Sequence, residues 1–274
     1  MTTDEYTKKD VGHRLAFIFA LPEEALGMLK AGEWEKVPSS PSRARYLGSV
    51  ASVNAVLAVS GIGRANAEEA TREVIEQYKP DAIVSLGFAG GLTAGDAVGD
   101  LVVAETLMPI EGTRVIGEPI DSASTLVQTS RDALEVKDIS ARFGLCLTTS
   151  HIASNPEAKT SLGKTMEALA VDMESYWIGQ ACRDNNVPFL AVRSIVDTVD
   201  HLLPAFVAEY TFEAGMKSRW RQVLPVLLRP WCIPGLLRLG AASARSQKSL
   251  ATFAVALSES YAQESIGHIV VESE

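Results

Sequence analysis

Largely apolar runs recur along the first 200 residues and alternate with segments of helical spacing. The runs that predict strands are residues 15–20, 52–60, 82–86, 98–107, 144–149, 169–171 and 189–196. Short apolar runs between turn signals are typical of strands buried on both faces of a sheet. Residues 33–48 predict a loop and an edge strand. The pattern therefore indicates a sheet with a well-covered interior.

Apolar residues at helical spacing separate these runs. The predicted helices begin at Pro22 and cover residues 64–78, 122–136, 155–167 and 174–185. Pro22 stands in a first helical turn, where proline is tolerated, and Glu23 and Glu24 follow it. Strands that alternate with helices predict an α/β domain with a mixed, mostly parallel sheet flanked by helices.

The last third of the chain has a different pattern. Residues 204–258 have helical spacing, interrupted by three prolines, and contain no further strand signal. We therefore predict one domain over residues 14–258, in which residues 204–258 are a helical extension. Residues 1–13 and 259–274 are expected to be polar tails.

Composition and charge exclude several classes of protein. The chain has 274 residues and a formal net charge of −9, a sign that argues against general binding of nucleic acid. Its three cysteines and four histidines lack the spacing of a zinc site, so no metal is expected. Few cysteines, no signal-peptide pattern and no apolar run of 18 residues together predict a cytoplasmic protein.

Candidate chemistry gathers where predicted strands end. Glu24 follows the first strand, a glycine-rich segment at 87–91 follows the third, and Glu174 and Asp197 follow the last two. In open α/β sheets, ligands bind beyond the carboxyl ends of the strands. These four features are therefore expected to lie close together.

Each of these features also has a purely structural interpretation. The glycines at 87–91 form either a tight turn or a loop whose amides approach a polar ligand. Asp172 and Glu174 either interact with a helix dipole or accept hydrogen bonds from a vicinal diol such as that of ribose. Asp197 is either a capping residue or a buried general acid, and Glu24 either stabilises a first helical turn or acts as a general base.

Four motifs occur in an order that resembles one enzyme superfamily. They are G-F-A-G-G-L at 87–92, V-G-D-L-V-V-A at 98–104, A-V-D-M-E-S at 170–175 and V-P-F-L-A-V-R-S-I-V-D at 187–197. Together they resemble the nucleoside phosphorylase and nucleosidase superfamily. Within it, they are similar to methylthioadenosine/adenosylhomocysteine nucleosidases over about residues 14–200. The resemblance implies a phosphorylase-like α/β fold and a homodimer.

The resemblance also implies a role for each matching residue. Glu174 would bind the ribose hydroxyls, and Met173 would pack on the sugar. Asp197 would protonate N7 of a departing purine, and Glu24 would deprotonate the attacking water. These roles fit cleavage of an N-glycosidic bond, which passes through an oxocarbenium-like sugar and needs both an acid and a poised nucleophile.

Other substrate contacts and two departures follow from the same resemblance. The loop around His151 and Ile152 would contact the base. Phe88 stands beside the sugar, where the family usually has Ser or Thr, and Val196 replaces a common Ser beside Asp197. The hydrogen bond that orients Asp197 is therefore expected to be missing. A catalytically weak nucleoside- or lipid-binding protein stays open as an alternative.

The sequence favours water over phosphate as the nucleophile. A phosphate nucleophile needs cationic partners, usually arginine. Ser85 and Leu86 stand where phosphorylases of the superfamily carry an arginine, although Arg64 could reach a phosphate. We expect hydrolysis of an adenine-type nucleoside without a cofactor. Phosphorolysis, with inorganic phosphate as co-substrate, is the alternative.

The C-terminal extension resembles another branch of the superfamily. L-P-x-L-L-R-P-x-x-x-P-G-L-L-R-L resembles the hopanoid-biosynthesis-associated branch, which is thought to act on adenosylhopane, a lipid nucleoside. Residues 217–248 carry seven basic side chains, no acidic one, and two tryptophans. Such a segment suits contact with an anionic membrane surface. Its alternative is a terminal helix pair that packs on the core.

Overall fold

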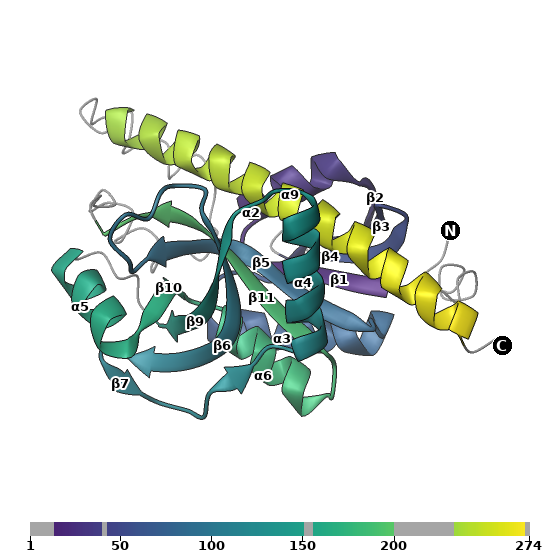
Figure 1. Ribbon diagram of the computed structural model, residues 1–274, viewed down its shortest axis with the longest axis horizontal. Helices are drawn as coiled ribbons and strands as arrows, with labels where there is room; N and C mark the ends of the chain where they lie inside the picture. The colour runs from purple at the N-terminus through teal and green to yellow at the C-terminus, as the bar shows by residue number, and fades with distance from the viewer. Residues whose placement is uncertain (1–13, 40–42, 151–155, 200–232, 272–274) are drawn as a thin grey trace.

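The computed structural model describes residues 14–39, 43–150, 156–199 and 233–271, and in the last range it describes the side chains of residues 240–263 (Figure 1). Its strands are β1 (Arg14–Phe19), β2 (Glu33–Val37), β3 (Arg45–Val50), β4 (Val53–Val59), β5 (Ala82–Gly91), β6 (Leu101–Glu111), β7 (Arg114–Val115), β8 (Ile120–Asp121), β9 (Ala141–Thr149), β10 (Ala168–Asp172) and β11 (Phe189–Asp197). Its helices are α2 (Pro22–Ala31), α3 (Arg64–Tyr78), α4 (Ser124–Val136), α5 (Pro156–Met166), α6 (Ser175–Asp184) and α9 (Ile233–Val271).

The strands form one mixed sheet in the order β10-β9-β6-β11-β5-β1-β4-β3-β2, and β7 and β8 both pair with β6. The pairs β1–β4, β1–β5, β5–β11, β6–β9 and β9–β10 are parallel. Strand β10 also pairs with β5, in the antiparallel sense, so that β5, β11, β6, β9 and β10 close into a ring. The predicted α/β fold, a mixed sheet flanked by helices, is confirmed.

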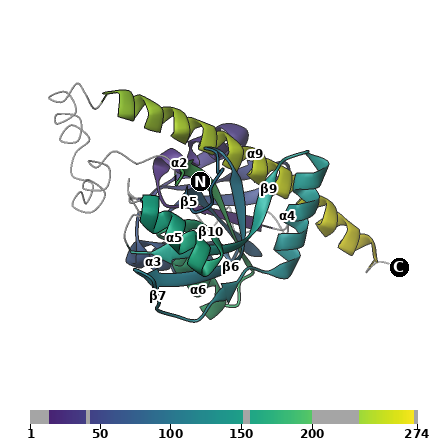
Figure 2. The same ribbon diagram turned by 60° about the vertical axis from the view of Figure 1, so that its left-hand side comes forward.

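Helices cover both faces of the sheet, and this explains the continuous apolar runs. On β1, Leu15, Phe17 and Phe19 pack with α2, α4 and α9, whereas Ala16 and Ile18 pack with α3 and α6. Figures 1 and 2 show α9 as one long rod on the side of α2 and α4, with α3 and α6 on the opposite side. Alternate residues of a strand point to opposite faces, so both sets must be apolar.

Two local predictions need correction. Residues 33–48 contain two strands, β2 and β3, which pair in the antiparallel sense, instead of a loop and one edge strand. The glycine-rich segment 87–91 belongs to β5 and pairs with β11 and β10, so it is not a turn. Pairing with β11, with β10 or, at Gly90, with both holds these glycines extended despite their low strand propensity.

The C-terminal helix α9 is part of the core. Leu250, Phe253 and Leu257 are fully buried or nearly so, and they pack in the same cluster as α2 and α4. The helix continues to Val271, into the segment that was predicted as a polar tail. Of the predicted membrane-contact segment 217–248, residues 217–232 lie outside the described residues. Within the described part of the chain, no helix combines the length and apolarity needed to cross a membrane.

Candidate active site

Glu24 lies in the first turn of α2, directly after β1, and its carboxylate is buried. Oε2 accepts hydrogen bonds from the backbone amides of Ala20 and Leu21, each at 2.9 Å. Oε1 accepts one from the amide of Phe88 on β5, at 2.8 Å. Burial raises the pKa of Glu24, and these three hydrogen bonds partly oppose the rise. A carboxyl group with a raised pKa binds a proton more readily than an exposed one.

Glu174 stands at the N-cap position of α6, but its side chain points back toward the turn before α3 and does not cap the helix. Its Oε1 accepts a hydrogen bond of 2.7 Å from the amide of Gly63. Burial, and next the charge of Asp172, raise the pKa of Glu174 to about 8. The charge of Glu24 adds to this rise, so the two glutamates lie close enough to interact electrostatically.

A buried arginine binds one of the carboxylates and lowers the pKa values of the other two through its charge. Arg193 of β11 donates from Nε to Asp172 Oδ2, at 2.7 Å, and from its terminal nitrogens to the carbonyl and hydroxyl of Ser85. Asp172 also accepts hydrogen bonds from Thr148 and from the backbone and hydroxyl of Ser175. We call Glu24, Asp172, Glu174 and Arg193 the carboxylate cluster. Asp172 is saturated by protein donors, which favours its structural interpretation.

Asp197 lies at the end of β11, beside the glycine-rich end of β5. It is 6 % exposed, and its register partner on β5 is Gly90. Oδ2 accepts a hydrogen bond from the ammonium of Lys159, a buried residue of α5. Burial raises the pKa of Asp197, while Lys159 opposes the rise. The carboxyl group is thus buried but paired.

The glycine-rich end of β5 joins the two halves of the site. A Cβ atom on Gly87 would lie 3.1 Å from Glu24 Oε1, and one on Gly90 would lie 3.1 Å from Asp197 Oδ1. Residues three apart on an extended strand are separated by about 10 Å. Glu24 and Asp197 therefore lie against different parts of the same strand end, with Met173, half-buried, before Glu174 on the neighbouring chain segment.

Comparison with known proteins places this geometry in a family. A family profile described as the phosphorylase superfamily matches residues 14–217. The chain belongs to the phosphorylase superfamily. The family resemblance and the expectation of an enzyme are thereby confirmed.

One relative supports the same placement, and two solved structures share the fold. A 5'-methylthioadenosine/S-adenosylhomocysteine nucleosidase from Exiguobacterium sp. is 32 % identical over 215 residues, which are 73 % of this chain and 92 % of that protein. A solved nucleosidase of the same name from S. pneumoniae, with a transition-state inhibitor, has a TM-score of 0.70 at 20 % identity and covers 90 % of this chain and 99 % of its own. Futalosine hydrolase of Helicobacter pylori has a TM-score of 0.68 at 19 % identity, with 89 % and 97 % covered.

Phe88 and Arg64, two other candidate site residues, lie in described parts of the fold. Phe88 is half-buried and packs on the α2, α4 and α9 side of the core, while its amide binds Glu24. Arg64 begins α3 next to Gly63, pairs with Glu68 and lies over the ring of Trp177, with its guanidinium carbon 4.1 Å from the ring centroid. His151 and Ile152 lie outside the described residues. No group of three or more possible metal ligands occurs in the described parts of the chain.

The sequence-based predictions did not include two buried charged residues of the site. They are Arg193 and Lys159. Arg193 carried a visible signal, because it interrupts the otherwise apolar strand at 189–196. Charged side chains are almost never fully buried unless they are paired. Lys159 carried no such signal, because a lysine in an amphipathic helix is ordinarily a surface residue.

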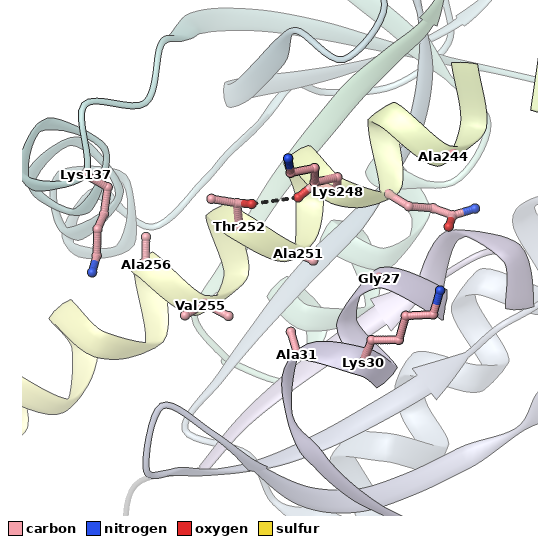
Figure 3. Close-up of a pocket in the computed structure, with 11 residues that line it drawn as sticks. Gly27, Lys30, Ala31, Lys137, Ala244, Lys248, Ala251, Thr252, Val255 and Ala256 are labelled. Atoms are coloured by element: carbon pink, nitrogen blue, oxygen red, sulfur yellow. Dashed lines mark hydrogen bonds between the residues drawn. The ribbon is translucent and has the colours of Figure 1, made fainter. Parts of the chain in front are cut away.

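A surface groove between α2, α4 and α9 has a volume of about 520 Å³ (Figure 3). Gly27 and Lys30 of α2, Lys137 after α4, and Lys248 and Ala251 of α9 contribute to its lining. None of the candidate carboxylates lines it. The groove is therefore separate from the candidate active site.

The raised pKa of Glu174 leads to a prediction about stability. Between its ordinary value of 4.5 and about 8, the folded protein holds a proton on Glu174 that the unfolded chain has lost. Rising pH therefore lowers the free energy of unfolding across this window. Glu174→Gln cannot ionise, so its stability relative to the unsubstituted protein should increase with pH, by at most about 1.4 kcal/mol per pH unit. Denaturant unfolding of both proteins from about pH 5 to about pH 8 measures this. A difference that stays constant with pH would contradict it.

Proposed function

We propose that the protein hydrolyses the N-glycosidic bond of an adenine-type nucleoside and releases the purine base. The observation that carries this proposal is the pair of buried carboxyl groups, Glu24 and Asp197, against one glycine-rich strand end. Cleavage of a glycosidic bond by water needs a base on one side of the sugar and an acid at the leaving group. The nucleosidases and the futalosine hydrolase among the relatives support the same class of reaction.

In this mechanism, Glu24 is the general base. Three backbone amides fix its carboxylate, and its two oxygens have about four acceptor positions, so room is left for a water molecule. Burial raises the pKa of Glu24 toward the range in which a carboxylate accepts a proton from water effectively. Glu24 would take a proton from the water as its oxygen bonds to C1′ of the sugar.

Asp197 is the general acid of the mechanism. Its burial favours the protonated form, which can donate to N7 of the purine as the bond from C1′ to the base breaks. Glu174 would bind the ribose hydroxyls, for which its second oxygen is available beside the one bonded to Gly63. Met173 would pack on the sugar, Phe88 would lie beside it, and the segment with His151 and Ile152 would contact the base.

We propose water as the nucleophile because Arg193, the buried cation of the carboxylate cluster, already donates its hydrogen bonds to protein groups. Arg193 donates to Asp172 and Ser85, and Arg64 is turned toward Glu68 and Trp177. A phosphate would need free cationic donors close to the sugar. The alternative is that Arg64 turns to bind a phosphate, so the experiment must be able to detect phosphorolysis.

The finer features of the substrate and assembly are further parts of the proposal. We propose a nucleoside substituted at the 5′ carbon, of which a lipid-linked nucleoside such as adenosylhopane is one candidate, handled by a homodimer. Contact of residues 217–248 with an anionic membrane surface would suit a lipid-linked substrate. The described part of this segment belongs to α9, whose buried side chains favour the core-packing alternative for that part.

The test is a product analysis with a panel of small and lipid-linked adenine nucleosides. We expect free adenine and a free reducing sugar, at a rate that does not depend on inorganic phosphate. A sugar 1-phosphate that appears only with phosphate would replace hydrolysis by phosphorolysis. Binding of the panel without release of adenine would instead support a catalytically weak binding protein.

A further inference from the structure

Lys159 is a lysine buried inside the candidate active site. Its side chain, on α5, is only 3 % exposed and forms an ion pair with Oδ2 of Asp197. Removing a lysine from water is costly unless a counter-charge and hydrogen bonds compensate it. The contact is therefore specific, and it joins α5 to the end of β11 across 38 residues of sequence.

We propose that Lys159 is a positioning residue, which holds Oδ2 of Asp197 so that Oδ1 faces the leaving base. This inference rests on the proposed function and adds a residue to it. The residue beside Asp197 in the chain, Val196, has no hydroxyl with which to orient the carboxyl group. Lys159 supplies that missing contact from a different element.

The strand opposite Asp197 is shaped to admit this pair. Gly90 of β5 faces both partners, and a Cβ atom there would lie 3.1 Å from Asp197 Oδ1 and 3.1 Å from Lys159 Nζ. Contacts of that length are tighter than ordinary packing, so a side chain at this position would displace the carboxyl group or the ammonium. Glycine at this position leaves room for both Asp197 Oδ1 and the ammonium that binds Oδ2.

Two opposing effects set the protonation of Asp197. Burial favours the neutral acid, and the ammonium of Lys159 favours the carboxylate. Strand β5 faces Asp197 with Gly90, which carries no charge, and the carboxylate cluster interacts chiefly within itself. Among the described residues, Lys159 is thus the charge that acts on Asp197.

This arrangement defines the proton-transfer step. The proton on Oδ1 passes to N7 of the purine while the electron pair of the bond to C1′ moves onto the base. Asp197 is left as a carboxylate, and Lys159 stabilises it without giving up a proton. Solvent returns a proton to Asp197 after the base departs. Lys159 therefore makes Asp197 a stronger acid than burial alone would allow.

The kinetic test compares Lys159→Met with Lys159→Arg. Without the cation, the pKa of Asp197 should rise, so the alkaline limb of kcat against pH should move to higher pH. We expect kcat at neutral pH to fall about 10- to 100-fold in Lys159→Met, with KM changed much less. Lys159→Arg keeps the charge and should recover most of kcat and the original limb. Lys164→Met, an exposed position on the same helix, is the matched control.

A second measurement needs no substrate, so failure of the proposed function and failure of this inference can be told apart. Carbon-13 NMR titration of labelled aspartate follows the carboxyl group of Asp197, assigned by its loss in Asp197→Asn. Its pKa should be higher in Lys159→Met than in the unsubstituted protein by at least about one unit. Equal pKa values, or an alkaline limb that stays in place or moves to lower pH in Lys159→Met, would overturn the inference.

Discussion

Asp197→Asn should abolish most of the turnover in the folded protein. The amide has the shape of the carboxyl group but cannot transfer a proton, and general acid catalysis contributes about 10²–10⁴ in rate. Because N7 of the base gains its proton only as the bond breaks, the loss should appear in kcat and much less in KM. Steady-state measurement of adenine release gives both constants.

Two controls make the Asp197→Asn result interpretable. Asp132→Asn alters an exposed aspartate of α4 and should leave kcat unchanged. Equilibrium binding of a non-hydrolysed nucleoside analogue to Asp197→Asn should stay near that of the unsubstituted protein. A variant that retains near-normal kcat would remove Asp197 from the mechanism.

Glu24→Gln should have the second largest effect, again in kcat. Glutamine retains an acceptor oxygen for part of the amide contacts of Glu24 but cannot take a proton from water. We expect a loss of about 10²–10⁴ in the rate of hydrolysis, with little change in affinity, because the side chain contacts the nucleophile and not the base. The unsubstituted enzyme and the variant are compared by single-turnover release of adenine.

The neighbouring residue supplies the control for Glu24→Gln. Glu23 lies in the same helical turn but is exposed, so Glu23→Gln should behave like the unsubstituted protein. Unfolding of Glu24→Gln must also be measured, because its carboxylate joins α2 to β5 through Phe88. A folded Glu24→Gln that hydrolyses at the normal rate would contradict the proposed base.

The sheet was predictable because its strands are buried on both faces. Residues such as Phe17 and Ile18 on β1 must both be apolar, which makes the strand visible as a continuous run. The end of β5 was misread because glycine usually marks a turn. Here glycine serves a different need, since the carboxyl groups of Glu24 and Asp197 approach the strand where a side chain would stand.

The proposed acid and base were identifiable from their positions at strand ends, but their partners were not all identifiable. Arg193 and Asp172 are 21 residues apart, and Lys159 and Asp197 are 38 apart. Such pairs form only when the sheet closes and α5 packs against it. No local spacing in the sequence encodes them. A charged residue inside an apolar strand, as at Arg193, indicates a buried ion pair even where its partner is distant in sequence.

The position of α9 has a consequence for how the enzyme becomes active during its synthesis. Ser246 of α9 donates a hydrogen bond to the carbonyl of Ile195, two residues before Asp197, and the carbonyl of Gln247 lies so close to α2 that Gly27 cannot carry a side chain. The last helix thus braces both the strand that ends at Asp197 and the helix that begins near Glu24. During translation, Glu24 and Asp197 are both synthesised well before α9. A chain in which α9 has not yet been synthesised would hold the proposed acid and base in an unsupported frame, so activity is expected only after α9 has emerged and folded.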